Sequence, residues 1–114
     1  MRDKRNRQRR NSPHRVNVIR CQNDAPLGRL VNITVDGLMY LGDQPEQIGA
    51  VLDLRLPLPT MANGKSCIEV RGKVIWCRAD ENPRYHRIGM EFEQLGAEEG
   101  YIIETVLQRL HLVG

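Results

Sequence analysis

The chain has 114 residues and a net charge of +3, with 40% hydrophobic and 27% charged residues. This length allows one domain with a modest core and is too short for two. No run of about 18 apolar residues occurs, and no apolar stretch follows the N-terminal charges, so we expect neither a membrane span nor a secretory signal. The three cysteines form no CxxC pair, which argues against a disulfide framework or a zinc site and favours a reducing, cytoplasmic location.

The positive charge is concentrated at the N-terminus. Residues 1–15 contain seven Lys or Arg and one acidic residue, Asp3, which gives +6, whereas the other 99 residues contain ten basic and thirteen acidic groups, which gives −3. We therefore expect a flexible basic arm over residues 1–15 and a folded domain over residues 16–114. An arm of this kind indicates an anionic partner, although a solubilising tail has the same composition.

Six segments with alternating apolar residues follow the arm, and each is typical of a β-strand. They cover residues 16–21, 29–34, 38–41, 50–56, 66–78 and 84–92. Residues 23–28 and the dipeptides Asp36-Gly37 and Asn63-Gly64 predict the turns. Pro57 and Pro59 predict the end of the fourth strand, because proline cannot donate to the ladder, and Gly72 indicates a bend or bulge in the fifth.

The end of the chain changes from the strand period to the helix period. From Ala97 onward, apolar residues follow the i, i+3, i+4, i+7 spacing of an amphipathic helix: Ile102, Ile103, Val106, Leu107 and Leu110. Six short strands followed by one helix predict a mainly β protein, a small six-stranded antiparallel barrel with a C-terminal α-helix.

Patterns typical of enzymes are scarce. The three histidines lie in the arm, in a strand and at the helix end without metal-ligand spacing, and no glycine-rich phosphate loop with a lysine occurs. We therefore expect no enzymatic activity, no metal and no cofactor.

The arm and residues 32–37 indicate nucleotide chemistry. The guanidinium of arginine matches phosphate and the O6/N7 edge of guanine, and it stacks on bases. Asn32 and Thr34 lie on one face of the predicted strand 29–34, where they could hydrogen-bond a base or ribose. Gly37 would turn the backbone with a positive φ and let it approach a ligand closely. Taken alone, these three residues are explained better by ordinary hairpin chemistry.

Four motifs in this order resemble the PilZ domain family. They are the arginine-rich stretch before the first strand, the NxTxxG run over residues 32–37, the strand over residues 70–76 that resembles GxVxW, and the strand over residues 87–92 that resembles xhGhxF. The family pattern at 32–37 is [D/N]xSxxG, so threonine replaces serine here and keeps the hydroxyl. The resemblance implies a six-stranded barrel that binds the bacterial second messenger cyclic di-GMP.

The resemblance also implies a role for each matching residue. Arginines of the arm would hold phosphates and guanine edges or stack on bases, Asn32 and Thr34 would hydrogen-bond a guanine, and Gly37 would shape the turn beneath it. Trp76 would pack near a base, or alternatively lie in the core with Val74.

The assignment of the arginines has two alternatives. Arg5 and Arg9 match the RxxxR spacing literally but lie far from the first strand. We favour Arg9 and Arg10 as the pair and Arg15 as the third arginine, because Arg15 directly precedes the strand.

The resulting hypothesis is a cytoplasmic receptor in bacterial second-messenger signalling, of the kind connected with motility and biofilm formation, that signals to an unidentified protein partner when its arm becomes ordered. One alternative is a small barrel that binds RNA or another polyanion, although the scarcity of aromatic residues argues against it. Another is an adaptor of the same fold that no longer binds the nucleotide.

Overall fold

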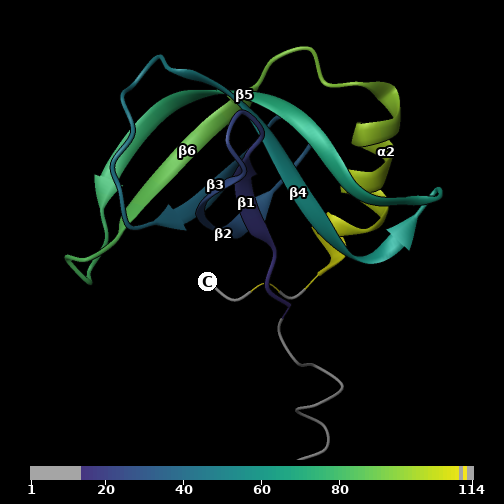
Figure 1. Cartoon of the computed structure of the whole chain (residues 1–114), viewed down its shortest axis with the longest axis horizontal. Coiled ribbons are helices and arrows are strands. Elements are labelled where there is room, and N and C mark those ends of the chain that lie inside the picture. The colour runs from purple at the N-terminus through teal and green to yellow at the C-terminus, as the bar shows by residue number, and fades with distance from the viewer. Residues whose placement is uncertain (1–13, 111, 113–114) are drawn as a thin grey trace, which may run out of the picture.

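A closed barrel of six antiparallel strands forms the body of the protein, in the order β1-β2-β3-β6-β5-β4 (Figure 1). The computed structural model describes residues 14–110 and 112. The strands are β1 (Asn17–Arg20), β2 (Ala25–Ile33), β3 (Gly37–Gly42), β4 (Val51–Ala62), β5 (Lys65–Ala79) and β6 (His86–Phe92). Helix α2 (Ala97–Thr105) and the 3-10 helix η1 (Leu107–Arg109) follow β6. The predicted fold class is confirmed.

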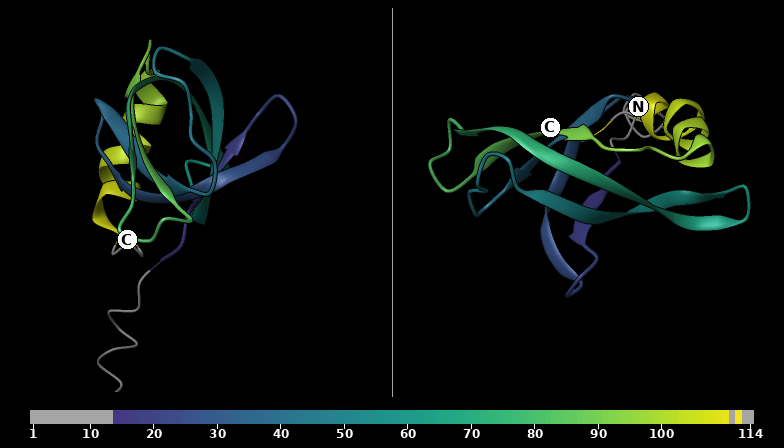
Figure 2. Two further views of the ribbon diagram at one scale, coloured as in Figure 1. Left: turned by 90° about the vertical axis from the view of Figure 1, so that its left-hand side faces the viewer. Right: turned by 90° about the horizontal axis from the view of Figure 1, so that it is seen from above.

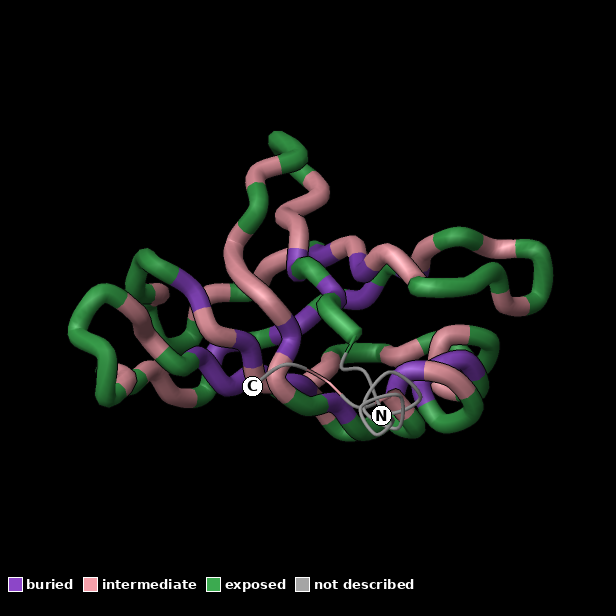
Figure 3. Tube along the Cα trace, turned by 90° about the horizontal axis from the view of Figure 1, so that it is seen from below, coloured by how far each residue is buried: buried purple, intermediate pink, exposed green. Residues whose placement is uncertain are grey.

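The core is aliphatic because alternate residues of the strands point into the barrel. Leu54, Leu56, Val74 and Ile88 have no exposed surface at all. Figure 3 shows the buried segments in the middle of the molecule and the exposed ones at the ends of the hairpins. The scarcity of aromatic residues therefore limits the core little, because Val, Ile and Leu fill most of it, together with Tyr40 and Met90.

Helix α2 and η1 pack against the barrel through the apolar positions that the helical period predicted. Ile102, Ile103 and Leu107 are at most 1% exposed. The views of Figure 2 show the helix beside the barrel, near the β4–β5 hairpin. At its N-terminal end, Glu98 and Glu99 lie 3.0 and 3.8 Å from the ammonium of Lys65 at the start of β5.

The prediction that Pro57 and Pro59 end the fourth strand is wrong, because β4 continues through both to Ala62. The partners of β1 on β4 are Leu54 and Arg55, so the later part of β4 pairs with β5 alone. The pairing with β5 becomes irregular between Pro57 and Ala62, where a residue without an N–H donor is tolerated. The Asn63-Gly64 turn is confirmed, with φ of 52° and 76° at its two residues.

The first turn is shorter than predicted. Strand β2 begins at Ala25, so residues 25–28 pair with β1 instead of forming a loop. Asp24 closes the turn with a φ of 56°, a conformation that Asp adopts more easily than most residues.

The described start of the chain leaves the barrel next to its C-terminal segment. Val16 is buried, and its carbonyl accepts a hydrogen bond of 2.8 Å from the Leu30 N–H. Before it, His14 forms a parallel bridge with Leu112. The predicted boundary between a flexible arm and a domain starting at residue 16 stays a prediction, since residues 1–13 lie outside the described part.

Candidate ligand-binding site

The β2–β3 hairpin presents Asn32 and Thr34 on the outer surface of the barrel. Both residues are exposed. The Thr34 N–H donates to the Gly37 carbonyl at 2.9 Å, and the Asp36 N–H donates to the Thr34 hydroxyl at 3.1 Å. Because the hydroxyl oxygen accepts this bond, its position is fixed while its own hydrogen remains available for a ligand.

Trp76 reaches the same surface because strand β5 contains a bulge. Val74 pairs with Met90, but Trp76 rather than Ile75 pairs with Gly89, so one extra residue lies in β5. The bulge places fully buried Val74 inside the barrel and half-buried Trp76 outside, although the two are two residues apart. Of the two alternatives for Trp76, the structure therefore excludes the core position beside Val74. The irregularity that we predicted at Gly72 lies three residues later.

Two glycines keep this surface flat. A Cβ atom on Gly89 would lie 2.2 Å from the indole ring of Trp76, so only glycine lets the ring lie across β6. A Cβ atom on Gly37 would lie 2.1 Å from the Met90 carbonyl oxygen, so β3 can approach β6 closely at this position. Gly37 does not adopt the positive φ that we predicted; within residues 14–110, glycines with positive φ are Gly49 and Gly64. The requirement for glycine at position 37 is steric crowding between strands, not backbone conformation.

Together these elements form a hollow of about 310 Å³, which we call the tryptophan hollow. Its floor is a row of neighbours across four strands, Asn32, Met39, Gly89 and Trp76. Its walls include Thr34, Gly37 and the carboxylates of Asp36 and Glu91. An indole face for stacking beside amide, hydroxyl and carboxylate acceptors suits a purine with N–H donors on its edge, as guanine has.

Arg15 lies close to this row along the backbone but lines a neighbouring hollow. Since Val16 is paired with Leu30, Arg15 lies level with Val31, one residue before Asn32. Its side chain lines a hollow of about 260 Å³ together with Asn17, Arg29 and Tyr85. Arg9 and Arg10 lie outside the described residues. The structure thus brings Asn32, Thr34, Gly37 and Trp76 together and leaves Arg15 beside them.

The comparison with family models matches the PilZ domain over residues 3–110 of the 114-residue chain. The chain belongs to the PilZ domain family. Domains of this family are cyclic di-GMP receptors and are generally not enzymes. A search of curated proteins gives no match for the chain.

Several residues in or beside the candidate site were not predicted from the sequence. Met39 was predictable as an outward-facing residue, because its neighbours Leu38 and Tyr40 both point into the barrel. Gly89 belongs to the strand that resembles xhGhxF, but its pairing with Trp76 depends on the bulge in β5. The guanidinium of Arg78, two residues after Trp76, lies 5.1 Å from the centre of the indole ring, within the range of a cation–π contact.

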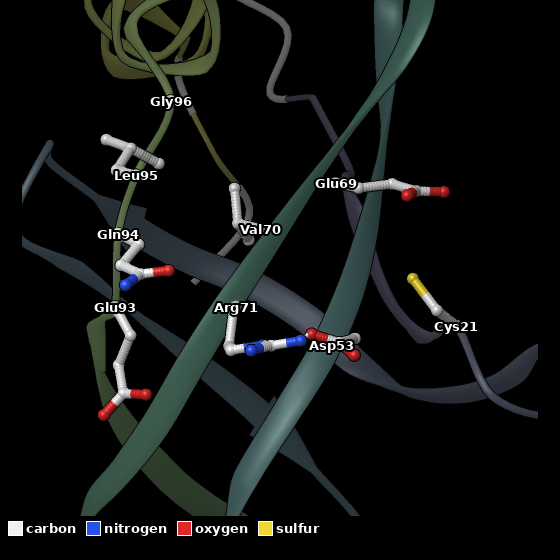
Figure 4. A pocket seen from close by; sticks show the side chains of 9 residues that line it. All are labelled: Cys21, Asp53, Glu69, Val70, Arg71, Glu93, Gln94, Leu95 and Gly96. Carbon is white, nitrogen blue, oxygen red and sulfur yellow. Dashed lines mark hydrogen bonds and ion pairs between the residues drawn. The ribbon is translucent and has the colours of Figure 1, made fainter.

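Another groove of the PilZ domain is less suited to an anionic ligand. It has a volume of about 390 Å³ and contains Asp53, Glu69 and Glu93. Figure 4 shows Arg71 of β5 pointing toward Asp53 of β4. The guanidinium donates a hydrogen bond of 2.8 Å to this carboxylate, and the bond lowers the pKa of Asp53 below its usual value. Since Arg71 is already paired, the groove presents mostly negative charge.

Two further classes of site find no support in the described part of the chain. Within residues 14–110 and 112, no group of three or more His, Cys, Asp or Glu side chains could hold a metal ion. Neither α2 nor η1 has the length and the apolar run needed to cross a bilayer.

Proposed function

We propose that this PilZ domain is a receptor for cyclic di-GMP that binds one guanine in the tryptophan hollow. Arg9, Arg10 and Arg15 hold the phosphates and guanine edges, and the ordering of the arm passes the signal to a protein partner. The observation that supports this proposal is that Asn32 of β2, Thr34 and Gly37 of the β2–β3 hairpin, and Trp76 of β5 line one hollow.

The charge of the hollow explains why the arm is needed. Asp36 and Glu91 line it, and none of the described residues that line it is Lys or Arg. A ligand with two phosphates is therefore repelled by the hollow alone, and the +6 arm supplies the compensating charge.

The energies are compatible with useful affinity. Charge-assisted hydrogen bonds contribute about 1.5–3 kcal/mol each. Ordering the backbone of an arm residue costs about 1–2 kcal/mol. A few bidentate arginine contacts together with base stacking can offset this cost and leave the roughly −8 kcal/mol of a micromolar complex.

Calorimetric titration of cyclic di-GMP tests the role of the arm. Arg9→Ala/Arg10→Ala should abolish binding and leave the circular dichroism spectrum unchanged. The matched control is Arg2→Ala/Lys4→Ala, which removes the same charge from the same arm outside the assigned motif and should keep most of the affinity. Undiminished binding by the Arg9/Arg10 variant would contradict the assignment. Equal losses in both variants, with steeply salt-dependent binding of GTP and a short RNA, would instead identify a polyanion binder.

Tryptophan fluorescence tests the hollow separately, because Trp76 is the single tryptophan of the chain. Saturating cyclic di-GMP should change its emission. Gly89→Ala should displace the indole, alter the emission of the free protein and weaken binding at least tenfold. Gly100→Ala is the control, since a Cβ atom there would make only an ordinary contact of 3.5 Å with Leu95. Normal affinity in Gly89→Ala would remove Trp76 from the site.

A further inference from the structure

Three arginines outside the arm form a row on the outer face of the barrel. Arg29 of β2 pairs with Leu41 of β3, Leu41 pairs with Arg87 of β6, and Arg87 pairs with Arg78 of β5. We call Arg29, Arg87 and Arg78 the arginine row. None of the three belongs to the arginine-rich motif before the first strand.

The arginine row runs alongside the floor of the tryptophan hollow. Leu41, Arg87 and Arg78 lie two residues along their strands from Met39, Gly89 and Trp76. Two residues of a strand span about 6.5–7 Å, and all these positions face the same side of the sheet. This separation is on the scale of that between the base of a nucleotide and its phosphate.

Arg29 has an unused hydrogen-bond donor. Its Nε atom is buried and has no hydrogen-bond partner among the described residues. Its side chain lines one hollow with Arg15 and a second, of about 270 Å³, with Tyr85 and Arg87. Arg29 therefore extends the positive charge of Arg15 onto the rigid sheet.

The other two members differ in how far they are already engaged. The Nε of Arg87 donates a hydrogen bond of 2.7 Å to Asp80. Asp80 and Glu81 both line the hollow of about 270 Å³ that Arg87 shares with Arg29. Arg78 is held over the indole of Trp76 and has no ion pair with any described residue. Arg29 and Arg78, at opposite ends of the row, are thus the members that are not paired with a carboxylate among the described residues.

We infer that the arginine row is a phosphate-binding subsite, in which Arg29 and Arg78 contact the two phosphodiesters of the ligand whose guanine lies against Trp76. This inference rests on the proposed function. A guanidinium binds phosphate bidentately, and these arginines are carried by paired strands. Unlike the arm, the row binds without ordering a segment of backbone, so its contacts contribute to affinity with little entropic cost.

The subsite is tested by calorimetry of cyclic di-GMP with Arg29→Gln, Arg78→Gln and the conservative Arg29→Lys. Each glutamine variant should weaken binding about tenfold, as loss of a charge-assisted contact does. Arg29→Lys should lie between wild type and Arg29→Gln, because lysine keeps the charge but not the planar fork. Arg109→Gln, on η1 and outside both rows, is the control and should bind like wild type.

Thermal denaturation of each variant separates loss of binding from loss of fold. Suppose that the wild-type chain binds, and that Arg29→Gln and Arg78→Gln are folded and bind with wild-type affinity. This result overturns the subsite and leaves the receptor function standing. Absence of binding by the wild-type chain overturns both proposals. If Arg29→Lys binds as weakly as Arg29→Gln, the result supports bidentate contact. If Arg109→Gln weakens binding as much as the row variants do, the loss of affinity reflects net charge alone, and the subsite is overturned.

Discussion

At the scale of single residues, the outward position of Trp76 shows how one backbone irregularity decides chemistry. Strict alternation from Ile68 through Val74 would place residue 76 inside the barrel. The extra residue Ile75 reverses the direction of the side chains after it, as any one-residue shift in a strand does. Ile75 and Trp76 therefore both face outward, and Ile75 is 45% accessible. Bulges are frequent next to functional sites because they re-aim one side chain without breaking the sheet.

Tyr40 is a residue whose polar group has no evident structural partner. It is 1% exposed, and its hydroxyl has no hydrogen-bond partner among the described residues. Burial raises the pKa of the Tyr40 phenol, and the nearby Glu46 carboxylate raises it further. The folded protein therefore keeps the phenol proton at a pH where an unfolded chain, with a tyrosine pKa near 10, loses it.

The pH dependence of stability follows from this difference. The contribution of Tyr40 is fully present below about pH 10 and is lost as the pH rises toward the raised pKa of the folded state. Tyr40→Phe should leave the free energy of unfolding at pH 7 unchanged or raise it by about 1 kcal/mol, because an unsatisfied buried hydroxyl is removed. Above pH 10 the variant should lose stability more slowly than wild type.

Urea denaturation between pH 7 and 11 measures this effect. Tyr101→Phe is the control, because Tyr101 is 56% exposed and should follow the wild-type curve. Parallel curves for Tyr40→Phe and wild type at high pH would show that the Tyr40 phenol does not govern alkaline unfolding.

At the scale of elements, alternation and helical period predicted the six strands and the C-terminal helix, but not that the helix ends at Thr105 and is followed by the 3-10 helix η1. The aliphatic residues of 66–78 and 84–92 are buried at the positions that alternation indicates, up to Val74 in the first and throughout the second. Local signals failed where tertiary pairing overrides them. The prolines of β4 are tolerated because β1 is too short to pair with that part of the strand.

The candidate site was predictable only where its residues are close together in the sequence. Asn32, Thr34 and Gly37 belong to one hairpin, so their proximity follows from local sequence. Trp76 is far away along the chain, and its place in the same row as Asn32 depends on strand order and on a bulge that no residue type predicts. The position of Gly89 under the indole likewise depends on the pairing of β5 with β6.

Two kinds of interaction attach α2 and η1 to the barrel. Leu107 is 1% exposed in the core, whereas the Lys65–Glu98 pair is exposed, with side-chain accessibilities of 41% on both sides. Leu107→Ala should lower the free energy of unfolding by about 2–5 kcal/mol, because it removes buried methyl groups and leaves a cavity. Lys65→Ala should have a much smaller effect, because water and salt screen an exposed pair.

Thermal denaturation of both variants at low and high salt checks this ranking. The smaller effect of Lys65→Ala should shrink further at high salt, and that of Leu107→Ala should not change. A larger loss for Lys65→Ala than for Leu107→Ala would show that the ion pair, and not apolar burial, holds this end of the molecule.

At the scale of the whole molecule, charge and core are separated along the chain. Residues 1–13 contain six Lys or Arg and Asp3, a net charge of +5, so the total of +3 leaves −2 for residues 14–114. The buried core begins at Val16, after the last of these charges. The net positive charge therefore resides in residues 1–13, whereas the contacts that stabilise the fold lie after them.

Removal of residues 1–13 tests this separation. The shortened chain retains the His14–Leu112 bridge and every buried core residue, so its thermal midpoint should lie within a few degrees of wild type. It should lose binding of cyclic di-GMP, since its net charge is −2 and Asp36 and Glu91 line the tryptophan hollow. Calorimetry and thermal denaturation measured on the same sample distinguish the two effects. A drop in the midpoint of more than about 10 °C would mean that residues 1–13 pack on the barrel and belong to the domain, because a shift of that size corresponds to more than about 1 kcal/mol.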